Sequence, residues 1–288
     1  MLGVSMPYRS SAIIISVYKD TEALGLILDS LLNQTLAPNQ IIISEDGDSE
    51  EMRQFMTTQI GRFPNLLHLT QPDNGWRKNR ALNRAIAASE AEYLIFIDGD
   101  CIPYPEFIEE HLKLEEPNHA LCGRRSEPGQ YFSTLLRTKK ISLKRYESTY
   151  LLNFFALKRD RVKHYEEGIY FGSHHPLFHF IHSISRKNSH IVGCNFSCHK
   201  SDMVRINGFD EEFTMPTTGE DSDIERRMRL LNIQMKSCRN AANMVHLDHP
   251  KNFNPEISAQ TTALMASKDD TPYCFNGLDQ HMNIGRSE

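Results

Sequence analysis

Apolar runs alternate with amphipathic segments through the first hundred residues. The runs are short and almost continuously apolar, as strands buried on both faces of a sheet should be. The expected strands are Ala12–Val17 (AIIISV), Ile41–Ser44, Leu66–Leu69 and Tyr93–Ile97 (YLIFI). Apolar residues at helical spacing predict helices between them, and these are Thr21–Leu32 with Asp20 or Thr21 as N-cap, Ser49–Ile60 and Arg77–Ser89. Strand–helix–strand units of this length predict an α/β fold with a mainly parallel sheet flanked by helices.

The pattern is less regular in the second half of the chain. The segment Arg124–His164 holds eleven Lys and Arg residues among aromatic ones, and it favours helix without one continuous apolar stripe. Ile191–Phe196 has the pattern of a strand. Gly219–Leu231 predicts a helix with an acidic first turn and a basic last turn, as the helix dipole favours. Residues 251–288 are polar and weakly patterned, which predicts a tail that wraps the domain or is partly disordered.

Composition narrows the class of protein. With 288 residues, 40% of them hydrophobic and 24% charged, the chain can bury a sizeable core as one large domain. A net charge of -5 and a pI near 6.2 argue against a dedicated nucleic-acid binder. No apolar run approaches the roughly 20 residues needed to cross a bilayer, and the first residues lack a signal-peptide pattern. The 6 cysteines form no CxxC pair, which favours free thiols in the cytoplasm.

Acidic residues follow two of the expected strands. Glu45-Asp46-Gly47-Asp48 follows the second, and Asp98-Gly99-Asp100 follows the fourth. Ligands of open α/β sheets bind at the carboxyl ends of the strands. Two carboxylates one residue apart can hold Mg²⁺ or Mn²⁺, which also takes phosphate oxygens, and Asp46 can accept a hydrogen bond from a base or a ribose. Simple turns are the alternative for both segments, since Asp and Gly are common in turns.

Three further groups of residues carry candidate chemistry. Arg77, Lys78 and Arg80 stand at a helix start, where the dipole disfavours cations, so they indicate either a bound anion such as phosphate or a solvated basic face. Glu220-Asp221 at the start of a helix is either a cap or a general base, and the dipole should lower the pKa of Asp221 and keep it ionised. The histidines of His246-Leu247-Asp248-His249 are a weak signal by themselves.

In this order the segments resemble a family 2 glycosyltransferase of the GT-A fold over about Ser10–Pro250. Three stretches carry the resemblance: AIIISVYKD with IIISEDGDSE, GWRKNRALNRAIAASEAEYLIFIDGDCIPYPEFIEEHL, and VGCNFSCHKSDMVRINGFDEEFTMPTTGEDSDIERRMR. The third is similar to the C-terminal half of galactosyltransferase-like and chondroitin-polymerase-like domains. The resemblance implies a Rossmann-like GT-A domain over 1–250, with a mixed, mainly parallel sheet and a basic helical insert at about 124–190, followed by a C-terminal tail over 251–288.

The resemblance also implies an activity and a site. The activity is inverting transfer of a sugar from a nucleotide-diphosphate donor, UDP-linked, to a hydroxyl of a saccharide or glycolipid acceptor in polysaccharide or glycolipid assembly. The implied roles are nucleotide-sugar binding by Val17, Tyr18, Asp46, Arg77, Asn83, Asp98 and Gly99; Mn²⁺ or Mg²⁺ binding by Asp100 and His246, with His249 as the alternative; general base catalysis by Asp221; and binding of sugar hydroxyls by Glu220.

The departures from the family pattern leave some questions open. Glu45 stands where relatives often have Asp, and Pro216-Thr217-Thr218 replaces their Trp-Gly, which leaves the donor sugar and acceptor undefined. The run Phe213–Thr218 is expected to order over the donor. The basic segment 124–164 binds an anionic or lipid-linked acceptor at a membrane surface, or it is a solvated insert. The competing classes are a sugar-phosphate nucleotidyltransferase, whose Gly-rich phosphate loop the chain lacks, and a non-catalytic nucleotide-sugar binder.

Overall fold

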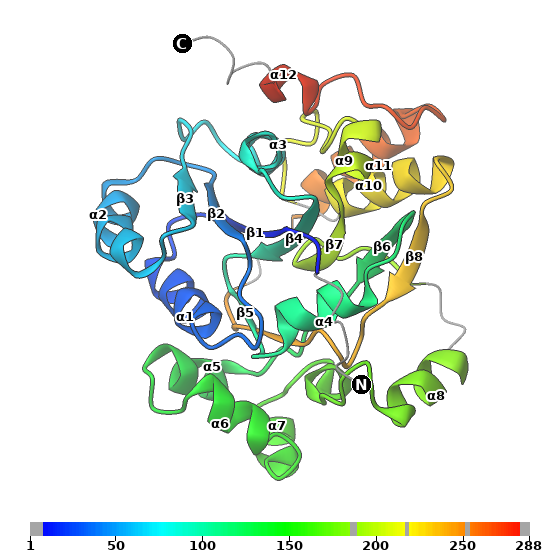
Figure 1. Cartoon of the computed structure of the whole chain (residues 1–288). Helices are drawn as coiled ribbons and strands as arrows, with labels where there is room; N and C mark the ends of the chain where they lie inside the picture. Colours follow the sequence, from blue (N-terminus) through cyan, green and yellow to red (C-terminus); the bar gives the residue numbers. More distant parts are fainter. Residues whose placement is uncertain (1–7, 185–188, 217–218, 251–253, 283–288) are drawn as a thin grey trace.

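A mixed sheet crosses the centre of the computed structural model, which describes residues 8–184, 189–216, 219–250 and 254–282 (Figure 1). Its strands are β1 Ser11–Val17, β2 Gln40–Glu45, β3 Leu66–Leu69, β4 Tyr93–Asp98, β6 His119–Cys122, β7 Asn195–His199 and β8 Gln234–Ser237. They lie in the order β3-β2-β1-β4-β7-β6-β8. All neighbours are parallel except that β7 runs antiparallel to β4 and β6. The expected mixed, mainly parallel sheet is therefore confirmed.

A second, two-stranded sheet adjoins the first. It pairs β5 Cys101–Pro103 with β9 Met244–His246 in antiparallel register, so that Cys101 lies opposite His246. This pairing brings the residues that follow β4 into contact with a segment almost 150 residues further along the chain. The small sheet therefore fixes one wall of the region beyond the carboxyl end of β4.

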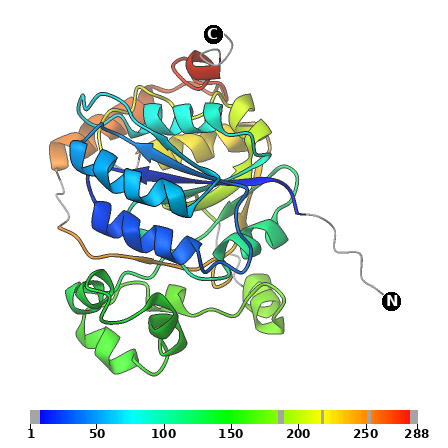
Figure 2. The same cartoon turned by 60° about the vertical axis from the view of Figure 1, so that its left-hand side comes forward.

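Helices surround the two sheets. Their bounds are α1 Thr21–Leu31, α2 Glu50–Gln59, α3 Lys78–Ala88, α4 Phe107–Leu114, α5 Gln130–Arg137, α6 Leu143–Ser148, α7 Phe154–Arg159, α8 Pro176–Ile184, α9 Lys200–Arg205, α10 Gly219–Leu230, α11 Pro255–Ser267 and α12 Asp279–Met282, with 3₁₀ turns at η1 Ile60–Arg62 and η2 Tyr165–Gly168. Apolar side chains of α1, α2 and α4 cover one face of the large sheet, and those of α3, α9 and α10 cover the other. Figure 2 shows these helical layers with the sheet between them.

The first hundred residues fold as their pattern predicts. In β1, Ile13 and Ile15 face the core under α1, while Ile14 faces the core under α3, so the strand is buried on both sides. The side chain of Asp20 accepts from the backbone of Ala23 at 2.9 Å and caps α1. Ser49 caps α2 in the same way. The carboxyl ends of β1, β2 and β4 consequently open at one edge of the sheet.

The basic segment after residue 124 forms several short helices rather than one. Helices α5, α6 and α7 lie on the outer side of α1, away from the large sheet (Figure 2). Aromatic rings hold them together: Phe132 contacts Tyr146, which contacts Tyr150, which stacks on Tyr165. The segment has no continuous apolar stripe because it is divided into short helices, each with its own few buried residues.

One expectation about the second half of the chain was wrong in detail. The strand expected at Ile191–Phe196 is β7, displaced toward the C-terminus. The backbone N–H groups of Ile191 and Gly193 donate to the carboxylates of Glu225 and Asp221 on α10, at 2.8 and 2.7 Å, instead of joining the sheet. Because these N–H groups bond to α10, the pairing with β4 begins only at Asn195.

The weakly patterned segment after residue 250 contains a helix that the sequence did not predict. Helix α11 begins with Pro255, and the side chain of Asn254 caps it. Thr261 is its buried residue, so its sequence shows no clear apolar face. It contacts α10, while α12 contacts α3. Among the described residues, no helix combines the length and the apolar character required to cross a membrane.

Candidate functional site

A cleft of about 630 Å³ opens where β1, β2 and β4 end. The start of α3, helix α5 and the segment after β9 complete its walls. Its lining residues are Ser16, Val17, Tyr18, Asp20, Asp46, Gly75, Trp76, Lys78, Asp98, Gly99, Asp100, Arg137, His246 and His249. The cleft thus brings together most of the residues to which the sequence assigns donor and metal binding.

The side of the cleft at the ends of β1 and β2 combines buried and exposed groups. Val17 is buried, while Tyr18 is about half exposed, and its hydroxyl donates to Asp73. Both carboxylate oxygens of Asp46 are engaged, by the side chain of Gln71 at 2.8 Å and by the backbone N–H of Arg77 at 2.7 Å. Asp46 therefore ties the end of β2 to the start of α3 and also lines the cleft.

Gly99 allows the chain to pass close to β1. A Cβ atom at this position would lie 2.8 Å from the carbonyl oxygen of Ser16 and 2.9 Å from the side chain of Val17. Only glycine fits without displacing β1, so Gly99 sets the positions of Asp98 and Asp100 relative to the end of β1.

An ion pair between Asp98 and Lys78 lies on the floor of the cleft, with Oδ1 and Nζ 2.7 Å apart. Burial by itself would lower the pKa of Lys78, but Asp98, Glu220 and Asp221 together raise it. Burial would raise the pKa of Asp98, and Lys78 brings it below its usual value. Lys78 therefore stays protonated, and its charge is balanced by carboxylates of this protein.

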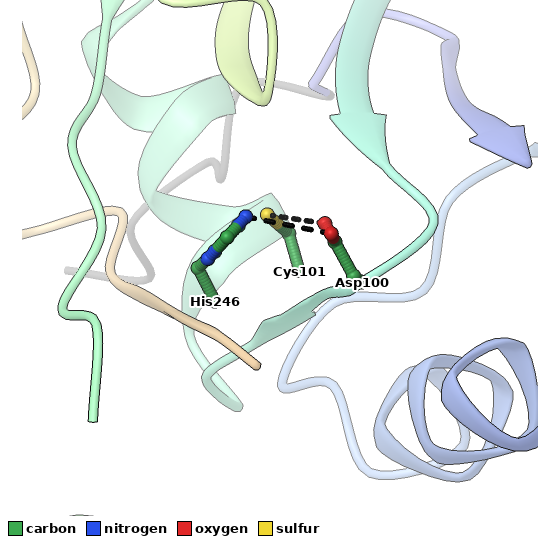
Figure 3. Close-up of side chains that lie close together, drawn as sticks. All are labelled: Asp100, Cys101 and His246. Atoms are coloured by element: carbon green, nitrogen blue, oxygen red, sulfur yellow. Dashed lines mark hydrogen bonds and ion pairs between the residues drawn. The ribbon is translucent and has the colours of Figure 1, made fainter. Parts of the chain in front are cut away.

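Asp100 is surrounded by two imidazoles and a thiol. Its Oδ2 lies 3.4 Å from Nε2 of His246 and 3.3 Å from Nε2 of His249, and its Oδ1 lies 3.5 Å from Sγ of Cys101. Figure 3 shows the side chains of Asp100, Cys101 and His246 converging. Their ligand atoms all lie within 4.8 Å of one another, which fits a divalent cation.

Glu220 and Asp221 lie beyond the Asp98–Lys78 pair, in a narrow crevice that also includes Lys78 and Asp98. Oδ2 of Asp221 accepts from the backbone N–H of Gly193 at 2.7 Å. Oε2 of Glu220 is buried and has no hydrogen-bond partner among the described residues. The two carboxyl groups thus line a crevice that adjoins the larger cleft at Ser16, Lys78 and Asp98.

The direction of the pKa shift expected for Asp221 was wrong. Burial raises the pKa of Asp221 above its usual value, although Lys78 and the Gly193 N–H oppose the rise. Burial also raises the pKa of Glu220, to about 8. The desolvation of a carboxylate outweighs the helix dipole, which is worth about 0.3–1 kcal/mol at an exposed helix end. A raised pKa makes a carboxylate a stronger base near neutral pH.

Two residues expected at the donor take other positions. The guanidinium of Arg77 donates to the carbonyl of Trp76, and its backbone N–H holds Asp46. Asn83 is fully buried, donates to the carbonyl of Phe209 and accepts from its N–H, both at 2.8 Å. Asn83 therefore joins α3 to the loop before α10, and it is not among the residues that line the cleft.

Sequence reasoning missed two cations near the site. Arg137 of α5 lines the cleft and pairs with Asp20 at 3.0 Å. Nη1 of Arg125 lies 2.8 Å from Sγ of Cys194, and its charge lowers the pKa values of Asp98 and Asp221. Both belong to the basic segment, whose charge count was visible, but nothing local distinguished them from their solvated neighbours.

Solved structures place this architecture in the GT-A class. The mannosyltransferase PcManGT of Pyrobaculum calidifontis, in complex with GDP-Man and Mn²⁺, matches with a TM-score of 0.55 and 12% identity, over 91% of this chain and 66% of the other. TarS of S. aureus matches with a TM-score of 0.53 and 14% identity, over 89% and 39%. At such low identity these likenesses show a shared fold alone.

The family follows from the sequence comparison. Residues 12–184 match Glycosyl transferase family 2, and residues 177–250 match the family described as the N-terminal domain of galactosyltransferase. Because the first match covers more than half of the chain, this protein belongs to glycosyl transferase family 2.

Curated relatives are longer than this chain. Hyaluronan synthase of Streptococcus pyogenes is 27% identical over 156 residues, which is 51% of this chain and 36% of the relative. Glycosyltransferase AglE of Haloferax volcanii is 31% identical over 111 residues, which is 36% of this chain and 34% of the relative. This chain therefore spans about a third of the length of these relatives.

Proposed function

We propose that this protein is an inverting glycosyltransferase that moves a sugar from a UDP-linked donor to a hydroxyl of a saccharide or lipid-linked acceptor. The observation that carries the proposal is that the cleft, with the metal-type cluster at Asp100, adjoins the crevice that contains the buried acids Glu220 and Asp221. The two cavities share Ser16, Lys78 and Asp98 in their walls. The cleft would hold the donor nucleotide, and the acids would face the sugar and the acceptor. Family membership and the GT-A fold agree with this assignment.

The proposed reaction uses the buried acids for proton transfer and sugar binding, while the nucleotide diphosphate leaves on the opposite face of the sugar. The carboxylate of Asp221 takes the proton of the acceptor hydroxyl, and that oxygen bonds to the anomeric carbon. The bond from this carbon to the diphosphate oxygen breaks on the opposite face, and UDP leaves with the electron pair. Burial makes Asp221 basic enough to accept the proton, and the Gly193 N–H orients it. Glu220 offers a buried acceptor to sugar hydroxyls.

The leaving diphosphate requires positive charge. A divalent cation, Mn²⁺ or Mg²⁺, bound by Asp100 and His246, with His249 as a further donor, would offset the charge that develops on the diphosphate. Lys78 and Arg137 line the same cleft and add fixed positive charge. Of the run expected to order over the donor, Thr217 and Thr218 lie outside the described residues.

UDP binding measured by calorimetry, with and without Mn²⁺, tests the donor assignment. We expect binding that requires the metal and is lost in Asp100→Ala. A screen of UDP-sugars for released UDP would follow on the wild type. UDP binding that ignores both the metal and the substitution would contradict the metal assignment. UDP binding without turnover of any UDP-sugar in the presence of acceptors would favour a non-catalytic binder, and pyrophosphate release would favour a nucleotidyltransferase.

We also propose that the basic segment 124–164 meets a membrane surface and places the cleft beside a lipid-linked acceptor. Helix α5 lines the cleft through Arg137, and three large apolar side chains further along the segment are exposed. Leu151, Leu152 and Phe155 point outward, with exposed fractions of 61%, 84% and 83%. Lysines and arginines of α6 and α7 flank these three residues, and this combination suits an anionic bilayer interface.

The ion pairs of the segment determine which residues a test of the proposed membrane contact should substitute. Lys139 is committed to Asp29 at 2.7 Å, so charge removal should target Lys140, Lys144 and Arg145. We expect Leu152→Asp with Phe155→Asp to abolish sedimentation with vesicles rich in anionic lipid. Phe275→Asp is the matched control, since Phe275 is 88% exposed and lies outside the segment 124–164, between α11 and α12. Unchanged sedimentation of the double variant would remove the membrane proposal and leave a solvated insert.

A further inference from the structure

The cation site described above contains a sulfur atom that neither the sequence pattern nor the family comparison assigns. Cys101 follows Asp100 directly, and its side chain is fully buried. Its Sγ belongs to the group of ligand atoms, with those of Asp100 and His246, that lie within 4.8 Å of one another. In Figure 3 the sulfur lies between the imidazole and the carboxylate.

The backbone enforces this position. Cys101 and His246 are directly opposed in the antiparallel pairing of β5 with β9. Directly opposed residues of such a pair project to the same face, with Cβ atoms about 4.5–5.5 Å apart. The N–H of Leu247 also donates to the carbonyl of Asp100 at 3.0 Å, which extends the pairing past the histidine. The thiol and the imidazole are thus neighbours because of strand register, not because of chance side-chain orientation.

We propose that Cys101 is a direct ligand of the cation and that the site prefers a borderline transition metal, such as Zn²⁺ or Co²⁺, to Mg²⁺. Carboxylate oxygen, imidazole nitrogen and thiolate sulfur form a donor set that suits Zn²⁺ and Co²⁺, whereas Mg²⁺ takes oxygen ligands. The cation replaces the thiol proton, which passes to solvent. The inference rests on the proposed metal site but not on sugar transfer.

The alternative role of Cys101 is that of an ordinary core thiol. Its S–H then donates to Oδ1 of Asp100 at 3.5 Å and takes no part in metal binding. The other cysteines supply a control for this alternative. Cys122 is also buried, but its Sγ contacts the carbonyl of Ala120 and the sulfur of Met235, and it is not among the three clustered ligands.

Cobalt spectroscopy on the full chain, without nucleotide or sugar, separates the two roles. We expect Co²⁺ to give a sulfur-to-cobalt charge-transfer band in the wild type and in Cys122→Ser, and no such band in Cys101→Ser or Cys101→Ala. Zn²⁺ affinity, measured by competition with a chromogenic chelator, should fall by about 10–100-fold or more in the Cys101 variants, since losing a direct ligand costs at least as much as losing an outer partner. Mg²⁺ affinity should change little.

Several results would overturn the proposal. These are Co²⁺ binding without a charge-transfer band in the wild type, a band that persists in the Cys101 variants, no Co²⁺ binding at all, or Mg²⁺ binding tighter than Zn²⁺. Circular dichroism of the metal-free variants shows whether they fold, and Cys101→Ala serves where Cys101→Ser does not. Because the readout needs no donor, these outcomes are independent of whether UDP binds or a sugar is transferred.

Discussion

Asp98 and Asp221 are both carboxylates beside Lys78, yet their pKa values move in opposite directions. Asp98 makes a 2.7 Å ion pair with Lys78, and its pKa is lowered. Asp221 lines the same crevice and interacts with Lys78 only by charge, without a hydrogen bond, and burial raises its pKa. The comparison shows that contact with a cation, rather than residue type, separates a permanent anion from a group that can exchange a proton. The first suits charge binding and the second suits base catalysis.

Asp221→Asn should produce the largest effect, because it removes the proposed base but keeps the shape of the side chain. We expect sugar transfer to fall by about 10²–10⁴-fold, the usual contribution of a general base. UDP binding should be unchanged, since Asp221 does not line the nucleotide cleft. Steady-state transfer rates and calorimetry check the two parts. A variant that keeps most of its rate would show that Asp221 is not the base.

Gly193→Ala tests whether the position of Asp221 matters as well as its charge. A Cβ atom at Gly193 would overlap Oδ1 of Asp221 and push the carboxylate away. We expect a loss of kcat of about 10²-fold, as for other small displacements of a reacting group. Gly61→Ala is the control, since its Cβ would have nothing within 4 Å. Equal kcat values for the two variants would argue that Asp221 needs no exact placement.

Lys78→Met removes the cation that interacts with Asp98, Glu220 and Asp221. In the wild type, the rate should rise with pH as the two acids lose their protons. Burial raises the pKa of Asp221, and it raises the pKa of Glu220 to about 8. Lys78 lowers both pKa values, so its removal should raise them and move the acidic limb of the kcat/KM profile to higher pH, by about one unit or more. Lys78→Arg keeps the positive charge and should return the acidic limb of the profile to its wild-type pH. A limb that does not move would mean that another group controls the rate.

Glu147→Gln should show the smallest effect, on stability instead of activity. Burial raises the pKa of Glu147 to about 7, Glu106 adds to the rise, and Lys144 opposes it. The folded state therefore holds the proton more tightly, and the stability this gives is complete below the ordinary pKa of 4.5 and lost as the pH rises through about 7. The variant should be more stable than the wild type at pH 8 by about 1 kcal/mol, and near pH 4 the gain should vanish.

Urea unfolding at the two pH values checks the Glu147 prediction. Glu116→Gln is the control, because Glu116 is exposed and Lys236 lowers its pKa, so this substitution should not stabilise the protein at pH 8. A gain for Glu147→Gln that is equal at both pH values would show that side-chain packing, and not protonation, is responsible.

The sequence by itself determined the first half of the fold and the identity of most candidate groups. Buried parallel strands leave a continuous apolar run, and caps such as Asp20 act within a few residues, so both can be read locally. The acidic strand ends at Asp46 and Asp98–Asp100 could be placed at one edge of a sheet for the same reason. Helix α11, whose side chains form no clear apolar face, left no such local signal.

Only the tertiary structure decided how these groups act. Desolvation depends on everything packed around a side chain, so the raised pKa of Asp221 could not be read from its place at a helix start. The pairing of β5 with β9 depends on register between distant segments, and it alone brings Cys101 to His246 and Asp100. The buried role of Asn83 has the same origin, because its partner Phe209 lies more than a hundred residues away. Local patterns report secondary structure, whereas burial and long-range contact set charge, ligation and reactivity.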